Sequence, residues 1–219
     1  MRIARLQSSE VQFVCPYAWR GVELALLLRQ DGHTFKLRHF SLVEGNHTDN
    51  TKELNWKITD QPLEDVATEG YMQYLTPSLR AFLAARAASQ QGEEQAWAFT
   101  LALFRAHHQH KNPLDENTIL QAASTAGLDL QQFQQALQDE AHLRSDLRQD
   151  LDLAREIGVF GTPTFVLPEG SAAYFRFENA TPDLAAARVR WDLYQQVLAN
   201  DAGMATIKRA KNRPARKIT

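Results

Sequence analysis

Residues 13–19 read Phe-Val-Cys-Pro-Tyr-Ala-Trp, and they contain the single cysteine of the chain, Cys15, directly followed by a proline. Residues 2–14 lead into this motif with the weak apolar–polar alternation of a strand. Pro16 suits the first turn of a helix, because its missing N–H group would have no acceptor there. The sequence therefore predicts a strand, a turn that carries Cys15, and a helix that runs to about Gln30.

The segment after the motif completes a strand–helix–strand unit. Leu24, Leu27 and Leu28 give the predicted helix an apolar stripe, and Asp31-Gly32 is a stop signal. Residues 33–42 then alternate cleanly between apolar and charged side chains, which indicates a second strand. The first 42 residues are thus predicted to form a βαβ unit with Cys15 at its first turn.

The middle of the chain has a different pattern. Residues 43–62 are polar and loop-like, whereas residues 63–157 contain no convincing strand. Capping residues followed by apolar residues at helical spacing indicate four helices in the second segment. These helices are expected to begin at Thr76-Pro77, after Gly92, at Asp115 and at Asp129. The sequence therefore predicts an all-helical insertion.

The chain returns to strand patterns after this insertion. Residues 164–167 are apolar or β-branched, residues 168–170 form a turn signal, and residues 173–178 alternate again. This pattern predicts a β-hairpin. A final helix is expected to begin at Thr181-Pro182, with an apolar stripe at steps of three and four residues.

Three stretches together resemble the DsbA-like branch of the thioredoxin superfamily. Residues 13–19 resemble its Cys-Pro-x-Cys-aromatic segment, residues 160–165 (Phe-Gly-Thr-Pro-Thr-Phe) resemble its cis-proline loop, and residues 94–106 and 119–127 read like its helical domain. The resemblance spans roughly residues 1–200 and is greatest to FrnE-like oxidoreductases and 2-hydroxychromene-2-carboxylate isomerases. It implies an α/β chain, a thioredoxin fold interrupted by an all-helical insertion. The implied segments are 1–62 and 158–200 for the thioredoxin domain, 63–157 for the insertion and 201–219 for a basic disordered tail.

One residue departs from that family pattern: Ala18 stands where the second active-site cysteine is expected. The chain therefore cannot cycle between dithiol and disulfide at its own site. Cys15 can still act alone, because a helix N-terminus favours the thiolate, which is the attacking species in disulfide exchange. We expect a monothiol thiol–disulfide oxidoreductase with Pro16, Tyr17 and Ala18 around the nucleophile. An external thiol such as glutathione would resolve the mixed disulfide, with no tightly bound cofactor.

The resemblance also implies a substrate-binding loop at Gly161, Thr162 and Pro163. The Thr162–Pro163 bond is expected to be cis and to abut Cys15, and an exposed edge at Thr162 would pair with an extended substrate backbone. The expected partners are protein or small-molecule disulfides and thiols.

Two other functions stay open at this stage. Glutathione transferases of the kappa class and the isomerase relatives use a serine where Cys15 stands, so a glutathione-dependent transferase or isomerase shares the fold. Loss of the second cysteine is also compatible with a non-catalytic peptide-binding module. Tyr17 is expected to line a groove and Trp19 to pack in the core. His107, His108 and His110 lack the spacing of a metal site and are expected on a solvated helix end.

The composition limits the remaining possibilities. With 219 residues and 44% hydrophobic residues the chain can bury a core, and no apolar run reaches the length of a membrane span. The first residues do not resemble a secretory signal, so we expect a cytoplasmic protein. Six basic residues and no acidic ones lie in 208–219, leaving 18 basic against 26 acidic residues in the body. Such an acidic body is not typical of a nucleic-acid platform. The oligomeric state is left open.

Overall fold

The structure is a computed structural model that describes residues 7–64 and 69–199. Its centre is a four-stranded sheet in the order β2–β1–β3–β4. The strands are β1 (Gln7–Val11), β2 (Phe35–His39), β3 (Thr164–Val166) and β4 (Ala172–Tyr174). β1 and β2 are parallel and are joined by α1 (Pro16–Gln30), whereas β3 and β4 form an antiparallel hairpin beside β1. The predicted βαβ unit and hairpin are therefore confirmed, while the predicted tail lies outside the described residues.

The last strand is shorter than the sequence pattern indicates. Alternation predicts a strand over 173–178, but β4 ends at Tyr174, which pairs with Thr164 at the start of β3. The next residue still donates its backbone N–H to the carbonyl of Pro163, at 3.2 Å. Residues after Phe175 have no partner in β3, because β3 begins at Thr164. The backbone hydrogen bonding between the two strands therefore ends there, although the apolar–polar alternation of the sequence continues.

Among the described residues between β2 and β3, five helices have eight or more residues. They are α3 (Leu75–Ser89), α4 (Glu93–Phe104), α5 (Glu116–Thr125), α6 (Leu130–Gln138) and α7 (Glu140–Ile157). The predicted caps at Asp115 and Asp129 are confirmed, since their carboxylates accept from the backbone N–H groups of Thr118 and Gln132. A short helix α2 (Leu42–Gly45) and three 3-10 turns precede α3.

Two helix starts differ from the prediction. α3 begins at Leu75 after a 3-10 turn, and the hydroxyl of Thr76 donates to the carbonyl of Glu64 at 2.9 Å instead of capping the helix. The predicted fourth helix is two helices, because Asp139 leaves the helical conformation and caps α7 through the N–H of His142. The side chain of Thr76 thus binds the carbonyl of Glu64 and does not act as the N-cap that its local sequence predicts.

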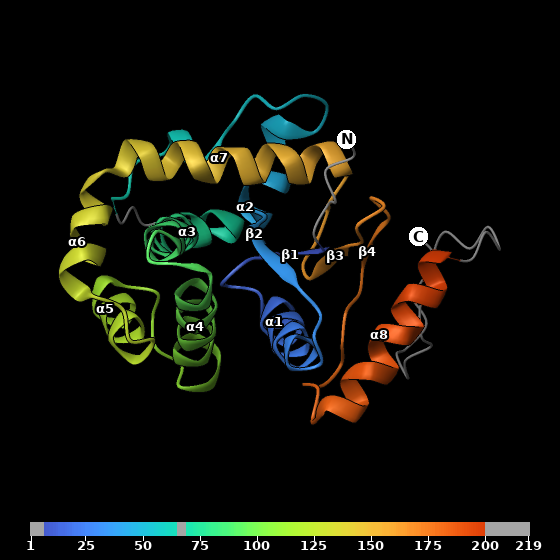
Figure 1. Cartoon of the computed structure of the whole chain (residues 1–219). Helices are drawn as coiled ribbons and strands as arrows, with labels where there is room; N and C mark the ends of the chain where they lie inside the picture. Colours follow the sequence, from blue (N-terminus) through green and yellow to red (C-terminus); the bar gives the residue numbers. More distant parts are fainter. Residues whose placement is uncertain (1–6, 65–68, 200–219) are drawn as a thin grey trace, which may run out of the picture.

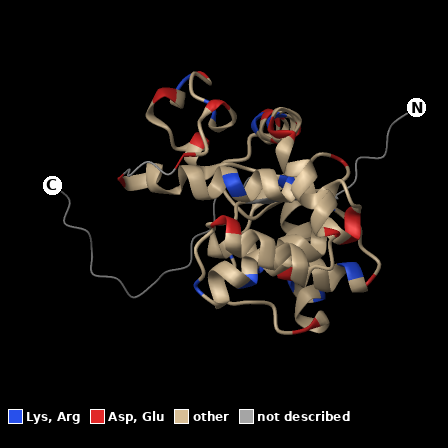
Figure 2. Cartoon of the chain, turned by 90° about the vertical axis from the view of Figure 1, so that its left-hand side faces the viewer, with Lys and Arg blue, Asp and Glu red and all other residues tan. Residues whose placement is uncertain are grey.

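The helices enclose the sheet from different sides (Figure 1). α7 lies above the strands and α1 below them, α3 to α6 group at one side, and α8 (Leu184–Ala199) lies beyond β4. On the side formed by the insertion, acidic and basic residues are interspersed (Figure 2). No helix within residues 7–64 and 69–199 combines the length and apolar character needed to cross a membrane.

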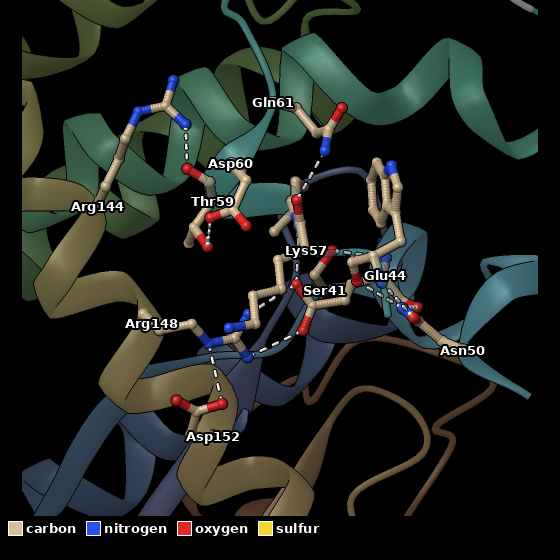
Figure 3. Close-up of polar contacts among 12 residues, drawn as sticks. Ser41, Glu44, Asn50, Lys57, Thr59, Asp60, Gln61, Arg144, Arg148 and Asp152 are labelled. Atoms are coloured by element: carbon tan, nitrogen blue, oxygen red, sulfur yellow. Dashed lines mark hydrogen bonds and ion pairs between the residues drawn. The ribbon is translucent and has the colours of Figure 1, made fainter. Parts of the chain in front are cut away.

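The segment between β2 and α3 is held by polar contacts rather than by regular structure (Figure 3). The buried carboxylate of Glu44 accepts two hydrogen bonds from Arg148 of α7, each 2.9 Å, and a third from the backbone N–H of Ile58. The side chain of Asn50 joins the carbonyls of Glu44 and Trp56. These bonds fix the segment against α7.

A second ionic cluster joins α7 to β2. Asp150, 3% exposed, pairs with Arg38 at 2.8 Å and Arg86 at 3.2 Å, and it accepts from the backbone N–H of His39 at 3.1 Å. Burial raises the pKa of Asp150, but the side chain of His39 and the charges of the two arginines outweigh it and hold the pKa at about 2. For His39, burial and the Arg86 charge lower the pKa to about 4 against the opposing effect of Asp150.

We expect the free energy of unfolding to fall as the pH drops from about 6.5 to about 4. The unfolded chain protonates His39 near its ordinary pKa of 6.5, whereas the folded chain keeps it neutral down to about 4. His39 alone contributes about 1.4 kcal/mol per pH unit in this window. Urea denaturation across this range checks the slope, which His39→Gln should reduce. The same change at the exposed His110 is the control, and equal slopes in all three proteins would contradict the prediction.

Candidate active site

Cys15 occupies the N-cap position of α1. Its φ of −96° and ψ of 115° are extended, and Pro16 is the first helical residue, as the sequence predicts. The backbone N–H of Cys15 donates to the carbonyl of Gln12 at 3.0 Å, which closes a tight turn between β1 and α1. Because the first N–H groups of a helix have no acceptor within it, the Cys15 side chain lies at the positive end of α1.

The loop before β3 meets Cys15 from the other side. The thiol of Cys15 donates to the carbonyl of Thr162, with 3.7 Å between sulfur and oxygen, although the two residues are 147 positions apart. The expected cis peptide bond between Thr162 and Pro163 is present. The structure therefore brings the motif around Cys15 and the loop Gly161–Pro163 into one site.

The exposed edge expected at Thr162 is not found. Thr162 is only 2% exposed, and its hydroxyl has no hydrogen-bond partner within the described residues. The exposed part of this loop is Phe160, which is 73% exposed. Thr162 is covered because Cys15 lies against its carbonyl, so the solvent-facing side chain of the loop stands two residues earlier.

Gly21 allows α1 to approach this loop, and the sequence analysis did not identify it. A Cβ atom at Gly21 would lie 2.4 Å from Cβ and 2.8 Å from Cγ of Pro163, which is closer than atoms pack. A side chain at this position would push α1 and Pro163 apart. Gly21 therefore sets the spacing between the helix that carries Cys15 and the loop that faces it.

Comparison with known proteins identifies the family. A family profile described as DSBA-like thioredoxin domain matches residues 11–190. The chain belongs to this DSBA-like thioredoxin family. The match includes Cys15, the helical insertion and the loop before β3, and it confirms the predicted fold class. No curated protein matches the sequence.

Solved structures share the fold of this DSBA-like chain at low sequence identity. A 2-hydroxychromene-2-carboxylate isomerase is 16% identical, with a TM-score of 0.60 over 92% of this chain and 100% of the other. The cytosolic disulfide reductase DsbM from Pseudomonas aeruginosa, solved with GSH, is 16% identical, with a TM-score of 0.55 over 87% and 99%. DsbA from Proteus mirablis, with a non-covalently bound peptide, is 13% identical, with a TM-score of 0.55 over 91% and 92%. These identities show the fold alone.

The two aromatic residues of the DSBA-like motif take different positions. Tyr17 is half-buried, and the guanidinium groups of Arg20 and Arg176 both lie over its ring. Trp19, expected in the core, lies at the edge of the core and stacks on His108, with 5.8 Å between ring centroids. The Trp19 ring therefore connects α1 to the helical insertion.

His108 is not on a solvated helix end, contrary to the expectation. It is half-buried in a π-helical turn, Arg105–Gln109, that extends α4. Its Nε2 lies 2.8 Å from the carbonyl of Phe13, and because a carbonyl only accepts, Nε2 carries the proton. Burial lowers the pKa of His108 to about 4, so the ring is neutral near pH 7. No sequence pattern linked this histidine to Cys15.

The helical insertion thus holds the turn that precedes Cys15. The side-chain amide of Gln12, fully buried, donates to the hydroxyl of Ser78 in α3 at 3.0 Å. The ring of Phe13 packs against Phe104 at 4.9 Å, and His108 binds the carbonyl of Phe13. The position of Cys15 therefore depends on the insertion as well as on the sheet.

Proposed function

We propose that this protein catalyses thiol–disulfide exchange by a monothiol mechanism, with Cys15 as nucleophile. The observation that carries the proposal is the position of Cys15 at the N-terminus of α1, with its sulfur against Thr162 beside Pro163. Ala18 takes the place of a second cysteine, and the chain contains no other thiol. A thiol at a helix N-terminus is favoured as the thiolate, which suits it to attack a disulfide.

The proposed reaction has two exchange steps. The Cys15 thiolate attacks one sulfur of a substrate disulfide and forms a new S–S bond, while the old bond breaks and the other sulfur leaves as a thiolate that takes a proton from water. The thiolate of an external thiol, such as glutathione, then attacks the substrate sulfur of the mixed disulfide. This second step leaves the substrate sulfur bonded to the external thiol and returns the electron pair to Cys15.

A glutathione-dependent transferase or isomerase is the second candidate. It is favoured by the TM-score of 0.60 to a 2-hydroxychromene-2-carboxylate isomerase, at an identity that shows the fold alone. In that reaction Cys15 would not form a disulfide, and serine could replace it, as in the relatives that this candidate resembles. The two candidates therefore differ in what a Cys15→Ser variant does.

We expect Cys15→Ser to lose at least about a hundredfold in disulfide-exchange rate, because a serine hydroxyl is a poor nucleophile without an activating base. Intact mass after incubation with oxidised glutathione should show one mixed disulfide on the parent and none on the variant. Reduced glutathione should remove the adduct. The rate is measured as reduction of 2-hydroxyethyl disulfide in the presence of glutathione.

The outcomes separate the candidate functions. A parent that forms no adduct, while both proteins are stabilised by reduced glutathione in a thermal shift, would support the transferase or isomerase. A Cys15 that reacts no faster than an ordinary thiol, with no thermal shift, would leave only a peptide-binding role. Both results would overturn the monothiol proposal.

A further inference from the structure

Two arginines face one aromatic ring directly beside the nucleophile. The guanidinium carbon of Arg176 lies 4.0 Å from the ring centroid of Tyr17, and that of Arg20 lies at 5.1 Å. Tyr17 stands two residues after Cys15, and Arg176 stands two residues after the end of β4. The contact therefore brings positive charge from the hairpin to the helix terminus that carries Cys15.

Among the described residues, the contacts of the Arg176 guanidinium are with uncharged groups. Arg20 donates to the carbonyl of Phe177 at 2.8 Å. Its charge also acts on Glu23, where burial raises the pKa of the carboxyl and the charges of Arg105 and Arg20 only partly offset this effect. Arg176 is exposed, and its guanidinium lies over the ring of Tyr17 and forms a hydrogen bond with the hydroxyl of Tyr174, both uncharged groups. The guanidinium of Arg176 is thus available to an anionic group that enters the site.

Tyr174 and Phe160 add two aromatic rings to the site, next to the loop at Gly161. Their rings meet edge to face with centroids 5.4 Å apart, and the Tyr174 ring lies 3.2 Å from the Cβ position of Gly161. Burial raises the pKa of Tyr174, the Arg176 charge lowers it, and the Cys15 charge raises it. Tyr174 therefore lies within electrostatic reach of both Cys15 and Arg176, and the exposed ring of Phe160 adds an apolar surface.

We propose that Arg176 makes this site selective for small disulfides that carry a carboxylate near the sulfur. Tyr17 holds the guanidinium in place, and Phe160 covers the apolar part of such a substrate. The inference rests on the proposed function, because it concerns the substrate that Cys15 attacks. The whole chain carries a net charge of −2, which would disfavour anions in general, so a preference for them must arise locally.

Three small disulfides of similar size test this selectivity. Dithiodiglycolate carries two carboxylates, 2-hydroxyethyl disulfide is neutral and cystamine carries two ammonium groups. In each case the Cys15 thiolate forms the mixed disulfide and one half of the reagent leaves as a thiolate. The second-order rate of adduct formation, followed by intact mass and corrected for the rate with free cysteine, is measured at low and high salt.

We expect the corrected rate to follow the order anionic, neutral, cationic, with about a tenfold preference for the anionic over the neutral disulfide at low salt. Arg176→Gln should remove most of that preference, because the rate with the anionic disulfide should fall much more than the rate with the neutral one. Arg188→Gln is the matched control, because Arg188 is also exposed but pairs with Asp31 at the far end of α1. The preference should also shrink in high salt.

The result distinguishes this inference from the proposed function. If no disulfide modifies Cys15 faster than free cysteine, the proposed function fails. If all three react rapidly but without a preference that depends on charge, the function stands and the role of Arg176 is wrong. An equal loss of the preference in Arg188→Gln would mean a general charge effect, and this too would overturn the inference.

Discussion

An Ala18→Cys variant is expected to form a disulfide with Cys15 and to release its substrate without an added thiol. Cys15 is the N-cap of α1 and Ala18 is the third helical residue. Side chains at these two positions are neighbours, as the reciprocal contacts of a capping box show. An introduced thiol could therefore attack the mixed disulfide on Cys15 and release the substrate, which an external thiol must do in the parent.

The expected gain is large because an intramolecular thiol acts at an effective concentration of mM or more. The reduced variant, freed of reductant, should therefore release reduced insulin in a single turnover about tenfold or more faster than the parent, which should remain in the mixed disulfide. Non-reducing mass spectrometry should show a loss of two hydrogens when the variant is oxidised. A variant that never forms this disulfide would contradict the geometry that we assign to Cys15.

The control for this variant must be a cysteine introduced at an equally buried alanine. Ala18 is fully buried, so the added sulfur must fit into the core at a cost of about 1–3 kcal/mol. Ala25→Cys is the matched control, because Ala25 is equally buried in α1 but lies two helical turns further along. It should show a similar loss of stability and no gain of turnover. A parent that is already active without an added thiol would contradict the monothiol mechanism.

Much of the fold could be predicted because its signals are local. The turn at Cys15-Pro16, the alternation that became β2, and the caps at Asp115 and Asp129 each depend on residues a few positions apart. Thr76 failed as a cap because its hydroxyl is bonded to a carbonyl 12 residues away. The predictions were thus wrong where a contact from another segment competes with the local one.

The site was harder to predict for the same reason. Only the family resemblance, and no spacing in the sequence, placed Thr162 beside Cys15, since the two are 147 positions apart. His108, Gly21 and Arg176 were missed because each contacts the site across two elements. A histidine, a glycine and an arginine at these positions have no local pattern that separates them from surface or helix residues. Their roles follow only from the packing of α1 against the hairpin and the insertion.

Asp150→Ala is expected to destabilise the fold by about 3–5 kcal/mol, because it leaves half-buried arginines without their counter-ion. Arg38 comes from β2 and Arg86 from α3, so the carboxylate joins the sheet to two helices of the insertion. The backbone N–H of His39 would lose its acceptor as well. In a domain of this size such a loss lowers the melting temperature by roughly 10 °C.

The same carboxylate indirectly supports the active site. His39 lies within 3.4 Å of Asp150, and its ring packs against Phe13, two residues before Cys15, with 5.9 Å between centroids. Asp150→Ala should therefore also loosen the packing around Cys15. The measurement is the rate of thiol labelling of the folded protein under native conditions, which should increase. Asp152→Asn is the control, because Asp152 lies on the same helix and its ion pair with Arg148 is half-exposed, worth about 0–1 kcal/mol. Equal losses of stability in the two variants, measured by urea denaturation, would show that the buried cluster does not join the insertion to the sheet.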